Sequence, residues 1–211
     1  MTGLEALQEV AAHVSVCTLC ELHYSRRLAV PGEGPANAEM MFIGEGPGFH
    51  ENEQGRPFVG AAGQFLEELL ASVGLKRRQV FITNVVKCRP PANRDPQIEE
   101  LLACSEYLER QIQAINPKVI ITLGRFSMAR FLPNARISEM HGQAVSVRGR
   151  LVVPMYHPAA ALHQPALRPI VVADFAKLPE WMAKAGNISK MQTEVTLSED
   201  RNLHSEQLSL F

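Results

Sequence analysis

Short apolar runs and amphipathic stretches alternate along the chain. Three apolar runs are short enough to be buried strands, namely Ala38–Gly44, Val80–Val86 and Val119–Leu123. Between and after them, Gly63–Val73 and Gln97–Ile115 carry apolar residues every three or four positions, as amphipathic helices do. Buried strands that alternate with helices favour a mostly parallel sheet covered on both faces. The pattern therefore predicts an α/β protein with three layers, α/β/α.

The rest of the pattern completes one domain. Near the N-terminus, apolar residues at helical spacing predict an amphipathic helix that runs into Cys17: Leu4, Leu7, Ala11 and Val14. Apolar runs on both sides of Arg148–Arg150 predict a hairpin leading into the last strand, and Ala173–Lys184 is expected to be the closing helix. Beyond this helix the sequence becomes polar and loses its period. We therefore expect one domain over residues 1–186 and a flexible tail over residues 187–211.

The composition suits a globular domain. Of the 211 residues, 46% are hydrophobic and 20% are charged, which is sufficient for a proper core. The formal net charge is −1, so no overall basic field indicates nucleic acid, although basic residues gather at Arg26–Arg27, Lys76–Arg78 and Lys87–Arg94. We expect neither a signal peptide nor a membrane span. A cytoplasmic location, where thiols stay reduced, follows as an expectation.

The chain contains four cysteines, and their spacing is its most informative chemical feature. Cys17 and Cys20 form a C-x₂-C pair, and Cys88 and Cys104 form a C-x₁₅-C pair. Two pairs that are distant in the sequence suit one site with four thiolates better than two disulfides. Zinc and a [4Fe–4S] cluster both fit four thiolates, and the spacing does not distinguish between them.

Three features come directly after predicted strands or at their ends, where parallel sheets bind ligands. Gly44–Gly48 (GEGPG) follows the first strand, Thr83–Asn84 lies near the end of the second, and His157–Pro158 follows the last. Taken singly, each has a structural explanation as a turn, a strand-end hydrogen bond or a cap. GEGPG also lacks the third glycine of the dinucleotide fingerprint. Their joint order and spacing nevertheless favour one site at this edge of the sheet.

Several longer segments carry a specific family resemblance. GEGPG, QGRPFVGAAG, ITNVVKCRPP, NRDP and YHPAA occur in this order together with the four cysteines. These segments, which cover roughly Val16 to Pro169, resemble an iron–sulfur (family 4) uracil-DNA glycosylase. The resemblance implies a four-stranded parallel sheet between helices, a structural [4Fe–4S] cluster on the four cysteines, and excision of uracil from DNA.

The resemblance also implies roles in base recognition. Phe58 would stack on the flipped base, Asn84 would hydrogen-bond its polar edge, and His157 would donate to uracil O2 and so act in catalysis. An amide can donate to O4 and accept from N3–H, whereas cytosine presents N4 donors and an N3 acceptor. Backbone N–H groups of the glycine loop are expected to assist, those around Gly44, Gly46 and Gly48.

The carboxylates near the glycine loop are a further part of the predicted site. Glu45 matches an acidic position in the family's first motif and is expected to orient water or to steady the oxocarbenium-like sugar. Glu51 is expected to crowd the methyl group of thymine. Asn52 stands where relatives often carry an aspartate, so this sequence departs from the family at that position.

The segment Ala159–Arg168 resembles the family's DNA-wedge loop. Leu162 is the residue expected to fill the gap left by the flipped base, with Arg168 beside the DNA. Relatives often carry an arginine where this sequence has His163, which weakens the expected phosphate contact.

Two alternative functions use the same features. A relative that traps uracil-DNA covalently would carry a basic, histidine-bearing insertion after the CRPP motif, but Cys88–Pro91 leads directly through Ala92–Asn93 to Arg94–Pro96. A non-catalytic, zinc-stabilised DNA-binding module would use the cysteines but would not need Phe58 and His157 at one sheet edge. Uracil excision by a monomer therefore remains the favoured hypothesis.

The chain ends in a short apolar motif after a polar stretch: Gln207, Leu208, Ser209, Leu210 and Phe211. This pentapeptide resembles the bacterial sliding-clamp-binding motif, in which the glutamine bonds at a pocket rim and the Leu–Phe end fills an apolar pocket. Chance stickiness and docking back onto the domain are the alternatives. The resemblance implies a sliding clamp as a partner beside uracil-containing DNA, and an enzyme associated with the nucleoid.

Overall fold

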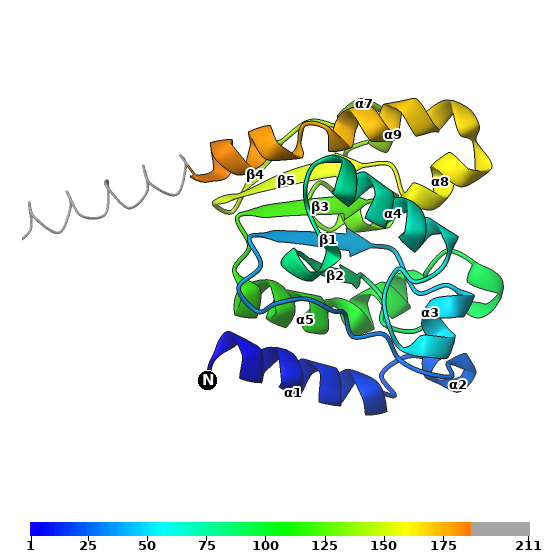
Figure 1. Ribbon diagram of the computed structural model, residues 1–211. Coiled ribbons are helices and arrows are strands. Elements are labelled where there is room, and N and C mark those ends of the chain that lie inside the picture. The colour runs from blue at the N-terminus through cyan, green and yellow to red at the C-terminus, as the bar shows by residue number, and fades with distance from the viewer. Residues whose placement is uncertain (187–211) are drawn as a thin grey trace, which may run out of the picture.

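A five-stranded sheet forms the middle layer of the structure, with the strand order β2-β1-β3-β5-β4 (Figure 1). The computed structural model describes residues 1–186, so the segment Gln207–Phe211 lies outside the described residues. The strands are β1 (Met40–Gly44), β2 (Phe81–Asn84), β3 (Val119–Leu123), β4 (Val145–Val147) and β5 (Arg150–Met155). β2, β1, β3 and β5 are parallel, and β4 pairs antiparallel with β5.

The predicted sheet is confirmed as mostly parallel and covered by helices, but it has one strand more than the four expected. The additional strand is β4, the first arm of the predicted hairpin. Arg148 and Gly149 have φ values of 50° and 78°, the left-handed conformation that a tight two-residue hairpin turn requires. The chain therefore folds straight back, and β4 extends the sheet at the edge of β5.

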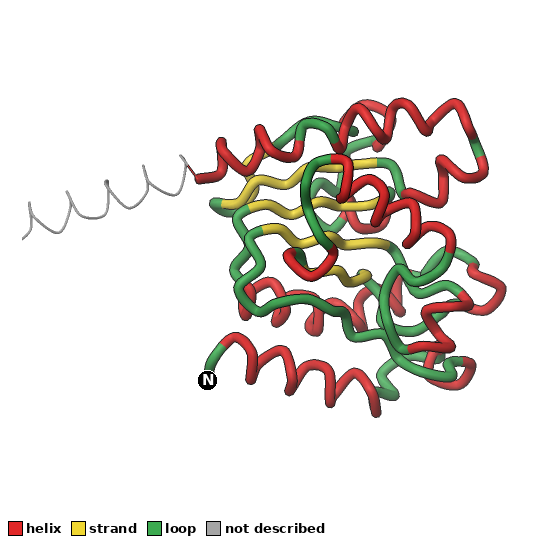
Figure 2. The backbone as a smooth tube through the Cα atoms, viewed as in Figure 1, coloured by secondary structure: helices red, strands yellow, loops and turns green. Residues whose placement is uncertain are grey.

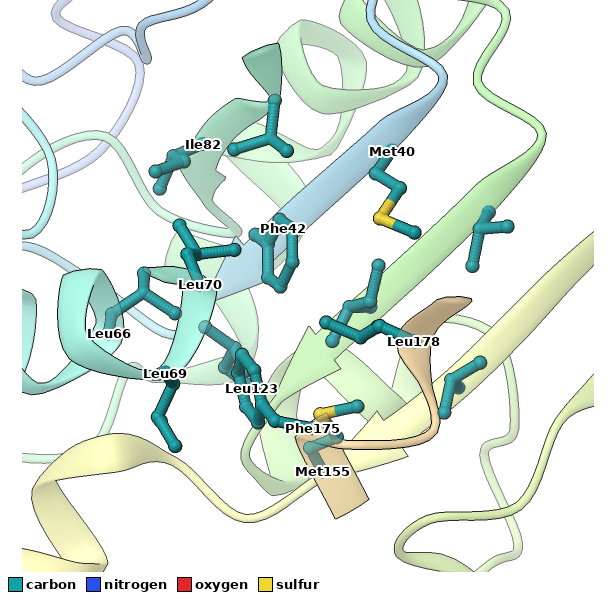
Figure 3. Close-up of a cluster of buried hydrophobic side chains, with 14 of the residues drawn as sticks. Met40, Phe42, Leu66, Leu69, Leu70, Ile82, Leu123, Met155, Phe175 and Leu178 are labelled. Atoms are coloured by element: carbon teal, nitrogen blue, oxygen red, sulfur yellow. The ribbon is translucent and has the colours of Figure 1, made fainter. Parts of the chain in front are cut away.

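The central strands are buried on both faces of the sheet. Every residue of β1, β2 and β3 is buried. Because successive side chains of a strand point to opposite faces, Phe42 joins one apolar cluster while Met41 and Ile43 join the other. Figure 3 shows the first cluster, where Phe42 lies near Leu70 and Phe175. Uninterrupted apolar runs in the sequence correspond to this two-sided burial.

Helices from two parts of the chain cover the first face. α4 (Ala61–Ser72) turns Leu66, Leu69 and Leu70 toward the sheet. α8 (Pro158–His163) and α9 (Arg168–Phe175) follow β5 and pack against α4 and against each other. These contacts attach the segment after β5 to the segment after β1, so both loops approach the same end of the sheet.

The second face is covered by α5 (Ile98–Ile115), which packs on the sheet through Leu108 and Ile112. α1 (Gly3–Val16) lies on the outer side of α5 (Figure 1). The N-terminal helix predicted from the apolar spacing is α1, and a capping box between Thr2 and Glu5 begins it. α6 (Arg125–Ala129) follows β3 directly and adds Phe126 to this face.

The loops that follow the parallel strands gather at one end of the sheet (Figure 2). Short helices interrupt the connections of the chain: α2 (Leu22–Ser25) before β1, α3 (Phe49–Gln54) after β1 and α7 (Ile137–Met140) after β3. They were not predicted, because four to six residues are too few for a helical period to be recognised. No helix within the described residues is long and apolar enough to cross a membrane.

Two predicted elements need correction. The closing helix is not continuous: α9 ends at Phe175, a turn occupies residues 176–177, and a further helix covers residues 178–186. Pro179 explains the break, because proline fits the first turn of a helix but not its interior. The expected wedge loop is also largely helical, since α8 and a 3₁₀ turn at Pro165–Leu167 occupy most of it.

Candidate active site

A cavity of about 560 Å³ opens at the carboxyl ends of the parallel strands. It collects residues from the loop after β1, the end of β2, the start of α6 and the loop between β5 and α8. Most of the predicted site residues line it: Glu45, Gly46, Gly48, Glu51, Phe58, Asn84 and His157. The prediction that separate motifs meet at one sheet edge is therefore matched by the arrangement of the chain.

Phe58 and His157 form one wall of this cavity. Their rings stack with centroids 5.5 Å apart and planes 24° apart. Phe58 has a φ of 51°, which is unusual for a bulky residue. Gly63 makes this conformation possible, since a Cβ there would lie 1.9 Å from the Phe58 carbonyl oxygen. Arg77 holds the same carbonyl with a hydrogen bond of 2.9 Å, so the ring is mounted on a constrained backbone.

Gly44 does not line the cavity, but its missing side chain shapes it. A Cβ at Gly44 would lie 2.4 Å from Asn84 Oδ1 and 2.7 Å from the Phe58 ring. Gly44 pairs with Asn84 in the parallel register of β1 and β2. The glycine therefore lets an amide and an aromatic ring approach across the end of β1.

The protonation of His157 follows from its contacts. His157 is the N-cap of α8, and its Nδ1 accepts the N–H of Ala159 at 3.1 Å. An imidazole whose Nδ1 accepts carries its proton on Nε2, which is then a donor. Burial lowers the pKa of His157 to about 4, and the nearby charge of Glu51 opposes that shift. At neutral pH the ring is thus an uncharged donor.

Asn84 brings an unused hydrogen-bonding group to the cavity. Its side chain is 1% exposed, and its Oδ1 is buried with no partner among the described residues. A buried acceptor without a partner costs free energy, so such groups often mark a ligand site. Asn84 also lies in the cavity lining, so its amide is a candidate for hydrogen bonding to a ligand.

Two carboxylates of the cavity have different surroundings. Burial raises the pKa of Glu45, while the N–H of Phe126 and the guanidinium of Arg125 act in the opposite direction. Glu51 accepts hydrogen bonds from the backbone N–H groups of Gly48 at 3.1 Å, Val59 at 2.8 Å and Gly60 at 2.9 Å. Glu51 thereby ties the glycine loop to the loop of Phe58. Its expected contact with a thymine methyl group stays a prediction.

The two predicted wedge residues lie outside the cavity lining. Leu162 is on α8 with 40% of its surface exposed, which is high for a leucine. Arg168 pairs with Glu68 at 3.0 Å, and its guanidinium lies 4.2 Å from the centroid of the Phe65 ring. His163, by contrast, does line the cavity.

Sequence reasoning missed several groups at the cavity mouth. Arg125 forms an ion pair with Asp95, and both line the cavity together with Tyr156. Arg94 is held by Glu100 through two hydrogen bonds of 2.6 and 2.9 Å. The NRDP and YHPAA motifs contain most of these residues, but motif matching gave them no role. Arg125 had no motif at all, and only its position after a buried strand could have indicated it.

The four cysteines line a second, smaller cavity. Arg26 donates a hydrogen bond to Cys88 Sγ at 3.4 Å, and the backbone N–H of Lys87 donates to Cys104 Sγ at 3.4 Å. Burial raises the pKa of Cys104 to about 11 and lowers that of Lys87 to about 7. Within residues 1–186, no three His, Cys, Asp or Glu side chains are grouped as the ligands of one metal ion would be.

Comparisons with known proteins agree with this architecture. The family model of the uracil DNA glycosylase superfamily matches residues 31–183. A type-4 uracil-DNA glycosylase of Sulfurisphaera tokodaii is 48% identical over 189 residues, which are 84% of this chain and 85% of the relative. Type-4 enzymes of Archaeoglobus fulgidus and Thermotoga maritima are 46% and 42% identical and cover 86% and 88% of this chain, and 96% and 99% of their own lengths. The chain therefore belongs to the uracil DNA glycosylase superfamily, and to its type-4 members.

The lowered pKa of His157 predicts a pH dependence of stability. The ordinary pKa is 6.5 and the folded value is about 4, so the unfolded chain binds more protons between these pH values. His157 should therefore make the free energy of unfolding fall as the pH drops from 6.5 toward 4. Urea unfolding across this range should show a shallower fall for His157→Gln than for the wild type. His13→Gln, on the exposed end of α1, is the control, and equal slopes for wild type and His157→Gln would contradict the prediction.

Proposed function

We propose that this protein removes uracil from DNA by hydrolysing the bond between the base and its sugar, leaving an abasic site. The main supporting observation is the pairing, in one cavity, of an uncharged histidine donor with an amide whose oxygen has no partner within residues 1–186. A cavity of about 560 Å³ can take a single base, but a base inside a duplex is out of reach. The nucleotide must therefore be flipped out of the stack, at a cost of a few kcal/mol.

Recognition of the base is assigned to Asn84 and Phe58. Once the amide turns toward the base, Asn84 Oδ1 would accept N3–H of uracil, and the amide nitrogen would donate to O4. Cytosine has an acceptor at N3 and donors at N4, so it would leave the same amide mismatched. Phe58 offers an aromatic face for stacking on the base, since its ring forms a wall of the cavity.

Catalysis is assigned chiefly to His157. As the bond to the sugar breaks, negative charge grows on the leaving uracil, including O2. A donor placed at O2 stabilises this charge more in the transition state than in the ground state. Because Nδ1 is occupied by Ala159, the Nε2–H group is the one available for O2. Its uncharged state avoids the cost of burying a cation in the cavity wall.

Glu45 is proposed to act on the sugar side. Its carboxylate lies in the cavity wall at the end of β1, next to Arg125 at the start of α6. There it can orient the attacking water or stabilise the oxocarbenium-like sugar. Leu162 remains the proposed wedge, since α8 presents an exposed apolar side chain three residues after the cavity-lining Ala159. The catalytic domain is proposed to be residues 1–186.

We also propose that the four cysteines hold a [4Fe–4S] cluster. Cys17, Cys20, Cys88 and Cys104 would each supply one thiolate to it. Four thiols around one cavity, two of them accepting N–H hydrogen bonds, suit this donor set. The cluster would cross-link α5 to the segment that follows α1. It would take part in no step of the reaction.

The activity prediction concerns the catalytic histidine and the recognition amide, His157 and Asn84. His157→Ala should slow uracil release by ~10²–10³-fold while DNA binding is largely retained, because a transition-state donor is lost. Asn84→Asp should also be impaired, since a carboxylate cannot donate to O4. Single-turnover assays on uracil-containing oligonucleotides measure both, with gels that also score covalent adducts. His13→Ala is the matched control, and wild-type rates in both site variants would refute the assignment.

The cluster prediction concerns metal content and stability. Cys88→Ser should contain less iron than the wild type after anaerobic purification and should unfold at a lower temperature, because a ligand of the cross-link is lost. Iron analysis, the brown absorbance and thermal unfolding measure these effects. Ser105→Ala, one residue after Cys104, serves as the control. Wild-type protein that contains zinc and no iron would contradict the proposal.

A sliding clamp is proposed as a partner of the segment Gln207–Phe211, on the strength of its sequence alone. A tethered enzyme would stay near replicated DNA at a raised effective concentration. Deletion of these five residues should abolish binding to a bacterial clamp but leave excision on short oligonucleotides unchanged. Surface-binding measurements and glycosylase assays test the two halves. Equal clamp affinity for full-length and truncated protein would contradict the proposal, as would loss of intrinsic activity.

A further inference from the structure

Lys87 is a buried lysine that pairs with no carboxylate of residues 1–186. Its side chain is 1% exposed, and its Nζ donates to three neutral oxygens. These are Thr83 Oγ1 at 2.7 Å, the Asn84 carbonyl at 2.7 Å and Gln111 Oε1 at 2.8 Å. In its charged form the group has three donors, and this set of acceptors uses all of them. Burying such a group is costly, and an apolar side chain of similar length would fill the space without that cost.

The contact with Asn84 satisfies a backbone carbonyl that the sheet leaves without a partner strand. β2 is the edge strand of the sheet, and a bridge between Glu33 and Ile82 covers its outer side only up to Ile82. The N–H of Val85 donates to Gly44 on the inner side at 3.0 Å. The Asn84 carbonyl belongs to the same peptide unit and therefore points outward, where no strand can pair with it. Lys87 Nζ donates to this carbonyl in place of the N–H group of a further strand.

The other two acceptors anchor Lys87 to the second layer. Gln111 is on α5, and its Nε2 donates to the Pro31 carbonyl at 2.6 Å. Thr83 donates to the same carbonyl at 3.0 Å. The end of β2, the segment before β1 and α5 thus converge on one nitrogen atom. Any shift of the Asn84 peptide would have to break this network.

We propose that Lys87 is a positioning residue for uracil recognition, which fixes the Asn84 peptide so that its side-chain amide faces the base. This inference rests on the proposed function, in which Asn84 hydrogen-bonds uracil. Lys87 does not line the large cavity, so it acts through Asn84 and never touches the base. The role predicts coupling between the two residues: the lysine matters only while the amide is present.

A double-mutant cycle tests this coupling. Lys87→Met keeps the length of the side chain and removes its donors. It should lower the single-turnover rate of uracil excision about tenfold in the wild-type background, and less than about twofold in the Asn84→Ala background. Damage to folding or to the cysteine cavity would instead lower the rate equally in both backgrounds. Equal losses would overturn the inference, as would a wild-type rate in Lys87→Met.

Two further variants keep the test decisive. Thr83→Val removes one acceptor with little change of shape, away from the cysteines, and should show a smaller loss with the same dependence on Asn84. If Lys87→Met loses iron or fails to fold, Thr83→Val decides, and equal losses in both backgrounds then overturn the inference. Lys118→Met, whose lysine pairs with Glu39 at the surface, is the control for removing a lysine. Failure of the wild type to excise uracil would overturn the proposed function and this inference with it.

Discussion

The parallel pairing of β1 with β2 is the constraint on which the cavity depends. It sets Gly44 opposite Asn84 and sends both strands out of the sheet at the same end. Because β3 and β5 follow the same direction, the turns after all four strands converge there. A glycine at the end of β1 then allows the amide of Asn84 and the ring of Phe58 to share space that any larger residue would fill. The arrangement of the site thus depends on the register of the two strands and on the absence of a side chain at Gly44.

The short segment 83–88 connects both functional regions of the molecule. Asn84 faces the large cavity, Cys88 faces the small one, and Lys87 between them bonds back to β2 and across to α5. Val86 belongs to the apolar cluster around the cysteines. A displacement of the backbone at the cysteine cavity is therefore expected to move Asn84 as well, because only a few peptide units separate the two regions.

The parts of the fold predicted from sequence are those with long or uninterrupted patterns. β1, β3, α4 and α5 were recognisable because two-sided burial and a sustained helical period leave clear marks. The break before Pro179 was missed, since apolar residues continue at helical spacing through it. The residues proposed for the site came from motifs whose order agreed with a known family. The motifs did not reveal what depends on three-dimensional contacts: the tautomer of His157, the use of Glu51 as a loop anchor, and Arg125 beside Asp95.

The close approach at Gly44 has a consequence for how this site can change over evolutionary time. Gly44 lies close to the side chains of Phe58 and Asn84, and Gly63 lies close to the backbone of Phe58. A new side chain at either glycine would displace the ring or the amide before it altered any contact with a base. A substitution at either glycine therefore requires a compensating change at Phe58 or Asn84. In this protein, a change of base preference is more accessible at the rim of the cavity or at Asn84 itself, with the glycines left in place.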